Sequence, residues 1–157
     1  MDHNLLRQYL STVYDLPMSG ERGPLRVSMD GDIVQDVSSL PELLIRPFTV
    51  LTAFNPRSML LPRKVNEGRH SVLRDMLILG CYRVEQCVGY EEDPEGTWRE
   101  PSWLVHDMDR EEAIAFGRVF RQNTIVVNRN GRPELIVTDP TCDELSKTFV
   151  GNWRVRG

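Results

Sequence analysis

The sequence predicts an α+β protein, with a single mixed or antiparallel sheet and helices packed on one face. Two observations carry this prediction. Between residues 48 and 139, apolar segments typical of strands alternate with two segments whose apolar residues recur at helical spacing. From residue 48 their order is strand, helix, strand, strand, helix, strand, which is the succession of a ferredoxin-like β-α-β-β-α-β core. The order of the strands within the sheet stays open.

The length predicts one domain over residues 1–157. A chain of 157 residues with 40% hydrophobic content is large enough to bury a core of its own. We expect the core at about residues 48–139, an N-terminal helix and hairpin within residues 1–47, and a short helix and tail within residues 140–157.

The first 47 residues predict a helix followed by a hairpin. Apolar residues at spacings of three and four indicate a helix from about residue 3 to residue 14, ended by Pro17 and Gly20. Alternating apolar residues follow at 25–29 and 33–37 around Asp30-Gly31, a dipeptide suited to a tight hairpin turn. Residues 40–44 predict a turn or a one-turn helix.

The central segment predicts a buried strand and a long helix. Residues 48–54 are almost all apolar, as in a strand buried on both faces. The next helix is expected from Asn66, as its N-cap, to Leu79, with Gly80 as its stop. Its expected buried residues are Val72, Leu73, Met76, Leu77 and Leu79.

Two strands and a second helix are expected next. Residues 82–90 alternate as a half-buried strand, and residues 98–105 predict a returning strand in which Pro101 indicates an edge or a bulge. If the alternation survives Pro101, then Glu100, Ser102 and Leu104 share a face. Asp109 begins a capping box that opens a helix with Ala113, Ala115, Phe116, Val119 and Phe120 on its apolar side.

The C-terminal segment predicts a second hairpin. Strands at 124–127 and 135–138 flank Asn130-Gly131, and Asp139-Pro140 can cap a short helix to about Ser146. The tail from Gly151 to Gly157 carries no pattern that assigns it to an element.

Charge is distributed unevenly along the chain. The formal net charge of −4 argues against a protein that holds nucleic acid by its overall field. From residue 54 to residue 75 there are five basic and two acidic residues, and from residue 91 to residue 112 there are nine acidic and two basic residues. This asymmetry fits either a site with two poles or two solvated faces.

The remaining composition indicates a cytoplasmic protein. Three cysteines without metal-ligand spacing suggest reduced thiols, and the N-terminus lacks the pattern of a signal peptide. No segment approaches the ~20 apolar residues of a membrane span. No phosphate loop, paired histidine ligands or nucleophile elbow occurs, so we expect no metal and no cofactor.

Polar residues gather where the central strand ends and the following helix begins. Asn66, Arg69 and His70 fall at i, i+3 and i+4, on one side of the first helical turn. A helix N-terminus with an arginine makes a receptor for phosphate or carboxylate. The alternative is a helix cap beside a surface arginine. Glu100 is the only well-placed acid–base candidate, and whether the protein is an enzyme stays open.

These residues resemble a known family. Thr52-Ala53-Phe54-Asn55-Pro56, the spaced Asn66 and Arg69, Glu100-Pro101-Ser102 followed by Val105, and Phe120-Arg121-Gln122 are similar, in order, to the pattern of bacterial domain-of-unknown-function family 3293. The resemblance covers roughly residues 48–127. It implies a common fold and a shared site formed by Asn55, Arg69, Glu100, Ser102 and Gln122, and it supplies no chemistry.

Two functional hypotheses follow. In the first, the protein binds an anionic small molecule or a nucleotide through Asn55, Arg57, Asn66 and Arg69, with Glu100, Ser102 and Gln122 nearby. In the second, it is a non-catalytic module that binds a protein or single-stranded nucleic acid through basic residues 57, 63 and 64 and exposed aromatic side chains. Convergence of the polar side chains on one pocket would favour the first hypothesis. The oligomeric state stays open.

Overall fold

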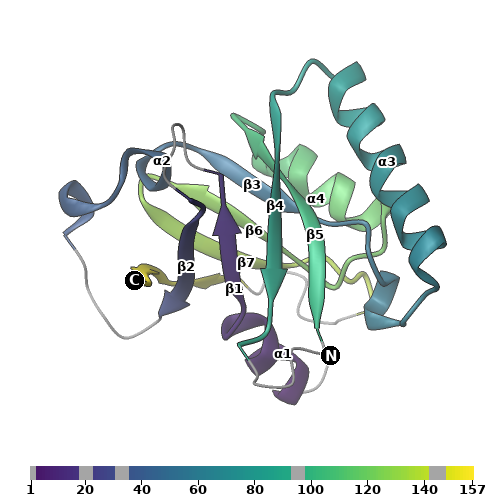
Figure 1. Ribbon diagram of the computed structural model, residues 1–157, viewed down its shortest axis with the longest axis horizontal. Helices are drawn as coiled ribbons and strands as arrows, with labels where there is room; N and C mark the ends of the chain where they lie inside the picture. The colour runs from purple at the N-terminus through teal and green to yellow at the C-terminus, as the bar shows by residue number, and fades with distance from the viewer. Residues whose placement is uncertain (1–2, 18–22, 31–35, 93–97, 142–147) are drawn as a thin grey trace.

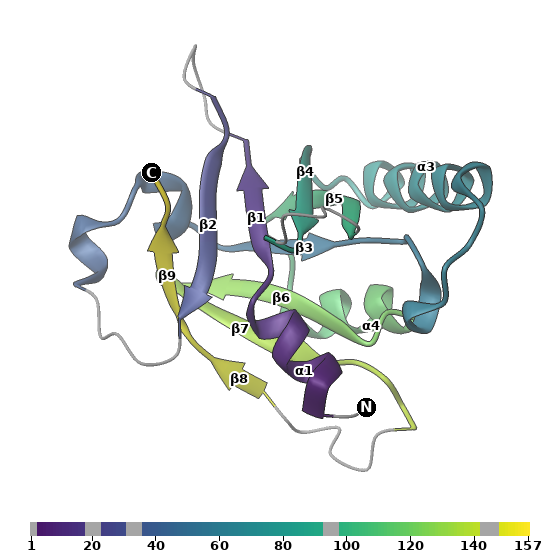
Figure 2. The same cartoon turned by 60° about the horizontal axis from the view of Figure 1, so that its bottom comes forward.

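Nine antiparallel strands form one sheet in the part of the chain that the structure describes. The structure is a computed structural model, and it describes residues 3–17, 23–30, 36–92, 98–141 and 148–157. The strand order is β8-β7-β6-β3-β5-β4-β1-β2-β9, and every neighbouring pair is antiparallel. The sheet curls into a nearly closed barrel (Figures 1 and 2).

The elements have the following bounds. The strands are β1 (Val13–Leu16), β2 (Leu25–Asp30), β3 (Phe48–Leu51), β4 (Val84–Tyr90), β5 (Arg99–His106), β6 (Thr124–Arg129), β7 (Arg132–Val137), β8 (Thr148–Val150) and β9 (Asn152–Val155). The helices are α1 (His3–Leu10), α2 (Glu42–Ile45), α3 (Arg63–Leu79) and α4 (Arg110–Val119), with 3-10 turns η1 (Val37–Ser39) and η2 (Pro56–Ser58).

The last described segment of the chain links the two ends of the sheet. Strand β8 pairs with β7, and β9, which begins one residue later, pairs with β2. Between them, the Gly151 N–H donates to the Pro133 carbonyl at 2.9 Å. Figure 2 shows β8 beside β7 and β9 beside β2. The tail carries no local pattern of a strand because its strand character depends on two partners that are distant in the sequence.

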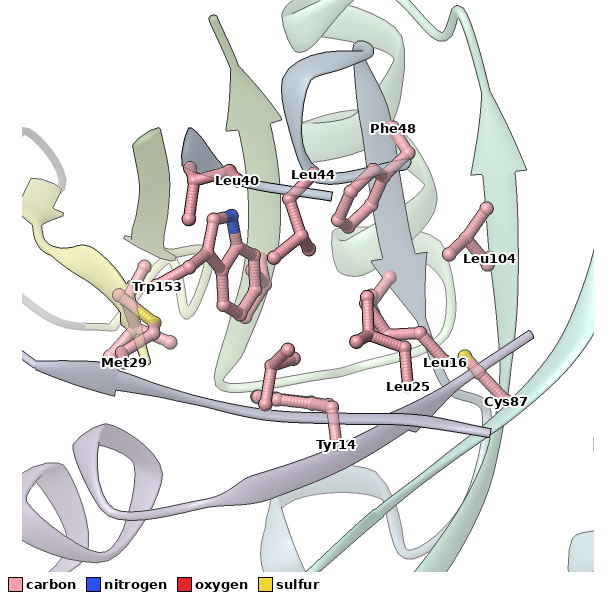
Figure 3. Close-up of a cluster of buried hydrophobic side chains, with 14 residues drawn as sticks. Tyr14, Leu16, Leu25, Met29, Leu40, Leu44, Phe48, Cys87, Leu104 and Trp153 are labelled. Atoms are coloured by element: carbon pink, nitrogen blue, oxygen red, sulfur yellow. The ribbon is translucent and has the colours of Figure 1, made fainter. Parts of the chain in front are cut away.

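Alternation along the strands produces two separate cores. One face of the sheet encloses a cluster that includes Phe48, Leu104 and Trp153 (Figure 3). The Phe48 and Trp153 rings stack with centroids 6.0 Å apart. The other face carries Trp103 and Val105, which pack with Leu73 and Leu77 of α3 and Ala113 of α4. Successive residues of β5 therefore point into the barrel and out of it in turn.

The predicted open sheet is wrong. Strands β3 to β6 and helices α3 and α4 follow the predicted succession, but the sheet is not a single sheet with helices on one face around a ferredoxin-like core. Strands β1, β2 and β9 extend it beyond β4, and β7 and β8 extend it beyond β6, so that it nearly closes into a barrel. Local periodicity fixes the elements, whereas closure depends on long-range pairing that periodicity does not report.

The N-terminal assignments need two corrections. The first helix ends at Leu10 instead of residue 14, because Val13 and Tyr14 pair with β2 and β4 as part of β1. Strand β2 has β1 and β9 as its neighbours, and neither was expected as its partner. Residues 31–35 lie outside the described residues, and Val37 begins η1. The one-turn helix near residues 40–44 is confirmed as α2.

Helix α3 begins earlier than predicted. Pro62 is its N-cap, so Asn66 lies inside the first turn and is buried. Leu73 and Leu77 are buried as expected, but Val72, Met76 and Leu79 are exposed. Gly80 ends the helix as predicted. The spacing of the apolar residues suggested one broad buried face, whereas α3 contacts the sheet along a narrow stripe.

The other local predictions are mostly confirmed. Strand β3 is buried on both faces, although it ends at Leu51. The Asp109 side chain caps α4 by accepting from the Glu111 N–H, and Asn130-Gly131, both at positive φ, joins β6 to β7. Strand β5 pairs with β4 from Arg99 but with β3 only from Trp103, so its first half, which contains Pro101, is an edge on the β3 side, as predicted. The helix expected to reach Ser146 lies outside the described residues beyond Thr141.

None of the helices that the structure describes has both the length and the apolar character needed to cross a bilayer.

Candidate functional site

A small cavity lies at one end of the barrel interior, where β3, β5 and β6 meet α1 and η2. Its volume is about 50 Å³. Residues of these elements, of β1 and β4 and of the neighbouring loops supply its wall: Tyr9, Tyr14, Val50, Thr52, Asn55, Ser58, Gly89, Trp98, Glu100, Ser102, Gln122, Asn123, Thr124, Ile125 and Val126. Four of the residues predicted for a site, Asn55, Glu100, Ser102 and Gln122, therefore line one cavity.

Strand alternation directs Glu100 and Ser102 toward the cavity. They lie on the same face of β5 as Leu104, which belongs to the barrel core. Glu100 is only 9% exposed. Its carboxylate accepts from the Asn55 side-chain amide at 3.3 Å and from the Trp98 side chain. The Ser102 hydroxyl donates to the Glu100 main-chain carbonyl at 3.2 Å.

Burial dominates the electrostatics of Glu100. Desolvation raises the pKa of its carboxyl to about 7, although the hydrogen bonds from Asn55 and Trp98 act to lower the pKa. Both of these donors are neutral. Within the described residues, no arginine, lysine or histidine lies at ion-pair distance from Glu100. The carboxyl is thus buried without a protein counter-charge, which is the kind of group that marks functional sites.

Asn55 connects the cavity to α3. Its backbone adopts the left-handed conformation, with φ of 46°, as asparagine tolerates better than most residues. Its N–H donates to the Asn66 side-chain oxygen at 2.9 Å, and its side-chain oxygen accepts from the Asn66 amide at 2.8 Å and from the Leu61 N–H at 3.1 Å. Asn66 therefore holds the loop from Asn55 to Leu61 on the helix and lies outside the cavity wall.

Arg69 ties three elements together from the first half of α3. Its guanidinium donates to the Ala53 carbonyl at 2.8 Å and to the Phe120 carbonyl at 2.7 Å, and it lies over the Phe120 ring. Burial lowers the pKa of Arg69. Arg69 does not line the cavity. His70, the next residue, stacks on Trp103 with ring centroids 4.3 Å apart.

Arg57 and Gln122 fasten the loop after β3 to the loop after α4. The Arg57 guanidinium donates to the Gln122 carbonyl at 2.9 Å and lies 3.7 Å from the Asp139 carboxylate. The Gln122 amide donates to the Phe54 and Phe120 carbonyls, each at 3.2 Å. Most of the predicted site residues therefore bind one another or the main chain, and Glu100 is the charged group that faces the cavity.

Three of the cavity residues that were not predicted from the sequence contact one another. Tyr9, Ser58 and Asn123 form a hydroxyl and amide cluster, with 2.7 Å between the Tyr9 and Ser58 oxygens and 3.0 Å between the Asn123 amide and the Tyr9 hydroxyl. Tyr9 is one of the residues whose spacing predicts the N-terminal helix, and that spacing does not indicate a contact of its hydroxyl group. Its contact with Asn123 spans most of the chain and leaves no local signal.

A second polar cluster lies at the other end of β5. The buried His106 ring lies 2.6 Å from the Glu85 carboxylate through Nε2, and Arg83 approaches the same ring at 3.1 Å. These residues line a cavity of about 280 Å³ together with Pro17, Leu25, Pro41, Glu42, Leu43 and Arg46. We call Arg83, Glu85 and His106 the His106 cluster, and Asn55, Trp98, Glu100 and Ser102 the Glu100 cluster.

The described residues contain no group of three or more histidine, cysteine, aspartate or glutamate side chains placed to hold a metal ion. The Glu100 cluster offers one carboxylate with amide and hydroxyl groups, a set suited to hydrogen bonding with a small organic group.

The family comparison covers the loops that build this site. The model of a family described as "Protein of unknown function (DUF3293)" matches residues 51–125. Residues 51–125 are therefore similar to this family. The match confirms the family predicted from the sequence motifs. The DUF3293 segment contains Asn55, Asn66, Arg69, Glu100 and Gln122, whereas Tyr9 and Tyr14 of the cavity wall lie outside it.

No curated protein and no solved structure matches the chain. The DUF3293 description names no activity, so the function is argued below from the geometry of the site.

Proposed function

We propose that the protein binds a small organic ligand through a cationic nitrogen group that enters the cavity beside Glu100. One observation carries the proposal: a buried carboxyl with a pKa of about 7 faces a cavity and has neutral hydrogen-bond donors in place of a counter-charge. A ligand cation would stabilise the ionised carboxylate. Tyr9, Tyr14 and Trp98 line the same cavity, and aromatic faces attract cations.

The size of the cavity limits what enters it. Complete small-molecule sites commonly occupy about 300–1,000 Å³, and this cavity has about 50 Å³. It therefore suits a head group of a few atoms, such as an ammonium or a guanidinium. The rest of the ligand would lie outside, near Ser58 and Asn123.

Binding of an anionic small molecule or a nucleotide at the Asn55/Arg69 loop–helix site stays a second prediction. Arg57 and Arg69 supply positive charge, but both donate to main-chain carbonyls, and Arg57 also faces Asp139. These contacts reduce the donors available to a ligand, so we rank anion binding below cation binding. A protein- or nucleic-acid-interaction module remains the alternative if no small molecule binds.

The pH dependence of binding separates a cation from an anion. We would titrate the protein calorimetrically with methylammonium, methylguanidinium, inorganic phosphate and adenosine monophosphate at pH 6 and pH 8. A cation favours the ionised Glu100, so its affinity should rise between pH 6 and pH 8 and its binding should release protons. An anion near Glu100 favours the protonated carboxyl, so its affinity should fall as the pH rises.

Two variants complete the experiment. Glu100→Gln should abolish cation binding, whereas Glu85→Gln in the His106 cluster should preserve it. No binding by either nitrogen cation, or binding that is tighter at pH 6, would overturn the proposal. Phosphate or nucleotide binding that depends on Arg57 and weakens at pH 8 would support the anion prediction instead.

General acid–base catalysis is a second candidate function, favoured by the pKa of Glu100. A carboxyl that titrates at about 7 can both accept and donate a proton near neutral pH. For a ligand found in the titrations, product formation should follow a pH profile with an inflection near that pKa. The Glu100→Gln variant should lose turnover, and an unchanged profile in that variant would exclude this role.

A further inference from the structure

Helix α3 carries a second apolar stripe on its solvent side. Val65, Gly68, Val72, Met76 and Leu79 follow one another at spacings of three and four residues, which places them on one face. The stripe lies apart from Leu73 and Leu77, which pack against the sheet. Val65 is 48%, Val72 53% and Leu79 83% exposed. Figure 2 shows α3 at one side of the molecule, extending away from the strands. A solvated helix face is expected to be polar, so this stripe indicates an interface.

Gly68 lies in the middle of the stripe. Glycine in a helix interior costs about 1 kcal/mol relative to alanine. A Cβ atom at position 68 would meet nothing within 4 Å, so packing within this chain does not require glycine there. A second helix that crosses the stripe closely would benefit from the missing side chain, because small residues let two helix backbones approach.

Charges beside the stripe indicate what the second helix is. Lys64 and Asp75 lie on the same flank of the apolar stripe, about three helical turns apart. The midpoint of residues 68–72 lies between them, at nearly equal distance from each. Asp75 lies 3.7 Å from Arg74 in an exposed pair of small energetic weight. An antiparallel copy of α3 would bring Lys64 near Asp75 of the partner subunit, and two-fold symmetry would form this pair twice.

We propose that α3 forms a two-fold interface with a second copy of this chain. The helices run antiparallel, with Gly68 against Val72 of the partner subunit and with the charged pairs at the flank. Stable interfaces usually bury about 1,200–2,000 Å² in total. One pair of helices provides an area at or below the lower limit, so the dimer forms in a concentration-dependent equilibrium with the monomer.

Sedimentation equilibrium of the full chain from about 5 to about 500 µM tests the proposal, a range that brackets a micromolar dissociation constant. The weight-average mass should rise toward that of a dimer. Val72→Glu should keep the protein monomeric. Val119→Glu is the matched control, since Val119 is an apolar residue on α4 that is 63% exposed, and it should leave the equilibrium unchanged. A monomer at every concentration, or a dimer that tolerates Val72→Glu, would overturn the proposal.

Charge exchange tests the antiparallel arrangement with substitutions at exposed positions. Lys64→Asp and Asp75→Lys should each weaken dimerisation about tenfold, because each places like charges together across the interface. The double variant restores both pairs and should recover the affinity. A double variant no stronger than the weaker single variant would contradict the arrangement, and circular dichroism would verify that all variants remain folded.

Discussion

The acidic side chains near the two ends of β5 have different partners. Glu100, near the start of the strand, is buried and accepts hydrogen bonds from neutral side chains. Glu85, on the neighbouring strand β4, pairs with His106 at the end of β5, beside Arg83. Glu100 and His106 share the inner face of β5 and are about 20 Å apart along the strand. Leu104 lies between them, so the barrel core separates the two clusters.

The two clusters differ in how far protein groups satisfy their polar side chains. In the His106 cluster, Nε2 of the ring lies 2.6 Å from the Glu85 carboxylate and 3.1 Å from the Arg83 guanidinium, so protein groups already contact the ring. In the Glu100 cluster, protein groups satisfy only part of the carboxylate. The larger cavity therefore has polar groups that already contact one another, and the smaller cavity has a buried carboxyl with a raised pKa.

Replacing Asn66 by alanine should destabilise the fold most. The Asn55 N–H and the Leu61 carbonyl would each lose a buried hydrogen-bond partner. Each unsatisfied group costs about 1–3 kcal/mol, so the free energy of unfolding should fall by about 4 kcal/mol. Urea denaturation monitored by tryptophan fluorescence would measure it. A loss close to zero would show that the loop beside Glu100 is not held by α3.

Replacing Glu100 by glutamine should stabilise the protein at alkaline pH. The folded-state pKa of about 7 lies above the ordinary value of 4.5, so the folded state binds the proton more tightly than the unfolded state. Stability of the wild type should therefore fall as the pH rises from about 4.5 through about 7, by about 2–3 kcal/mol. Glu100→Gln removes this dependence, so the free energy of unfolding of the variant should exceed that of the wild type by more as the pH rises. A stability difference that stays constant from pH 4.5 to pH 8 would contradict the raised pKa.

Replacing Glu85 by glutamine should destabilise the protein, which is the opposite of the effect expected for Glu100→Gln, and the change in free energy should be smaller. The His106 ring would exchange a charge-assisted hydrogen bond for a neutral one, a loss of about 1 kcal/mol. Urea denaturation at pH 8 would measure the free energies of unfolding of Glu85→Gln and Glu100→Gln against that of the wild type. Stabilisation by Glu85→Gln would show that the two clusters do not differ in the way described.

Replacing Arg46 by alanine should leave stability within measurement error. Arg46 contacts Glu42 one turn away on α2, and both side chains are largely exposed, with 57% and 78% of their surfaces accessible. Exposed pairs of this kind contribute little. Thermal unfolding at low and high salt would check this, and a large loss would give the rim of the His106 cavity a structural role.

Some parts of the site could be predicted from the sequence and others could not. Four of the five motif residues that the family resemblance assigns to a site, Asn55, Glu100, Ser102 and Gln122, line one cavity, and Arg69 does not. Asn66 and Arg69 looked like a ligand receptor because of their spacing at a helix start. They instead bind main-chain and side-chain groups of neighbouring loops. Spacing shows that side chains share a helix face, but it does not show what occupies the space opposite.

Features with short-range causes could be predicted from the sequence. The succession of elements from β3 to β6, the Asp109 cap of α4 and the Asn130-Gly131 turn each depend on a few neighbouring residues and their backbone preferences. The barrel depends on long-range pairing, because β1 and β9 become strands by pairing with distant partners. The chemistry of Glu100 also depends on the folded chain, since the burial that raises a carboxyl pKa comes from residues far apart in the chain, among them Tyr9, Asn55 and Gln122.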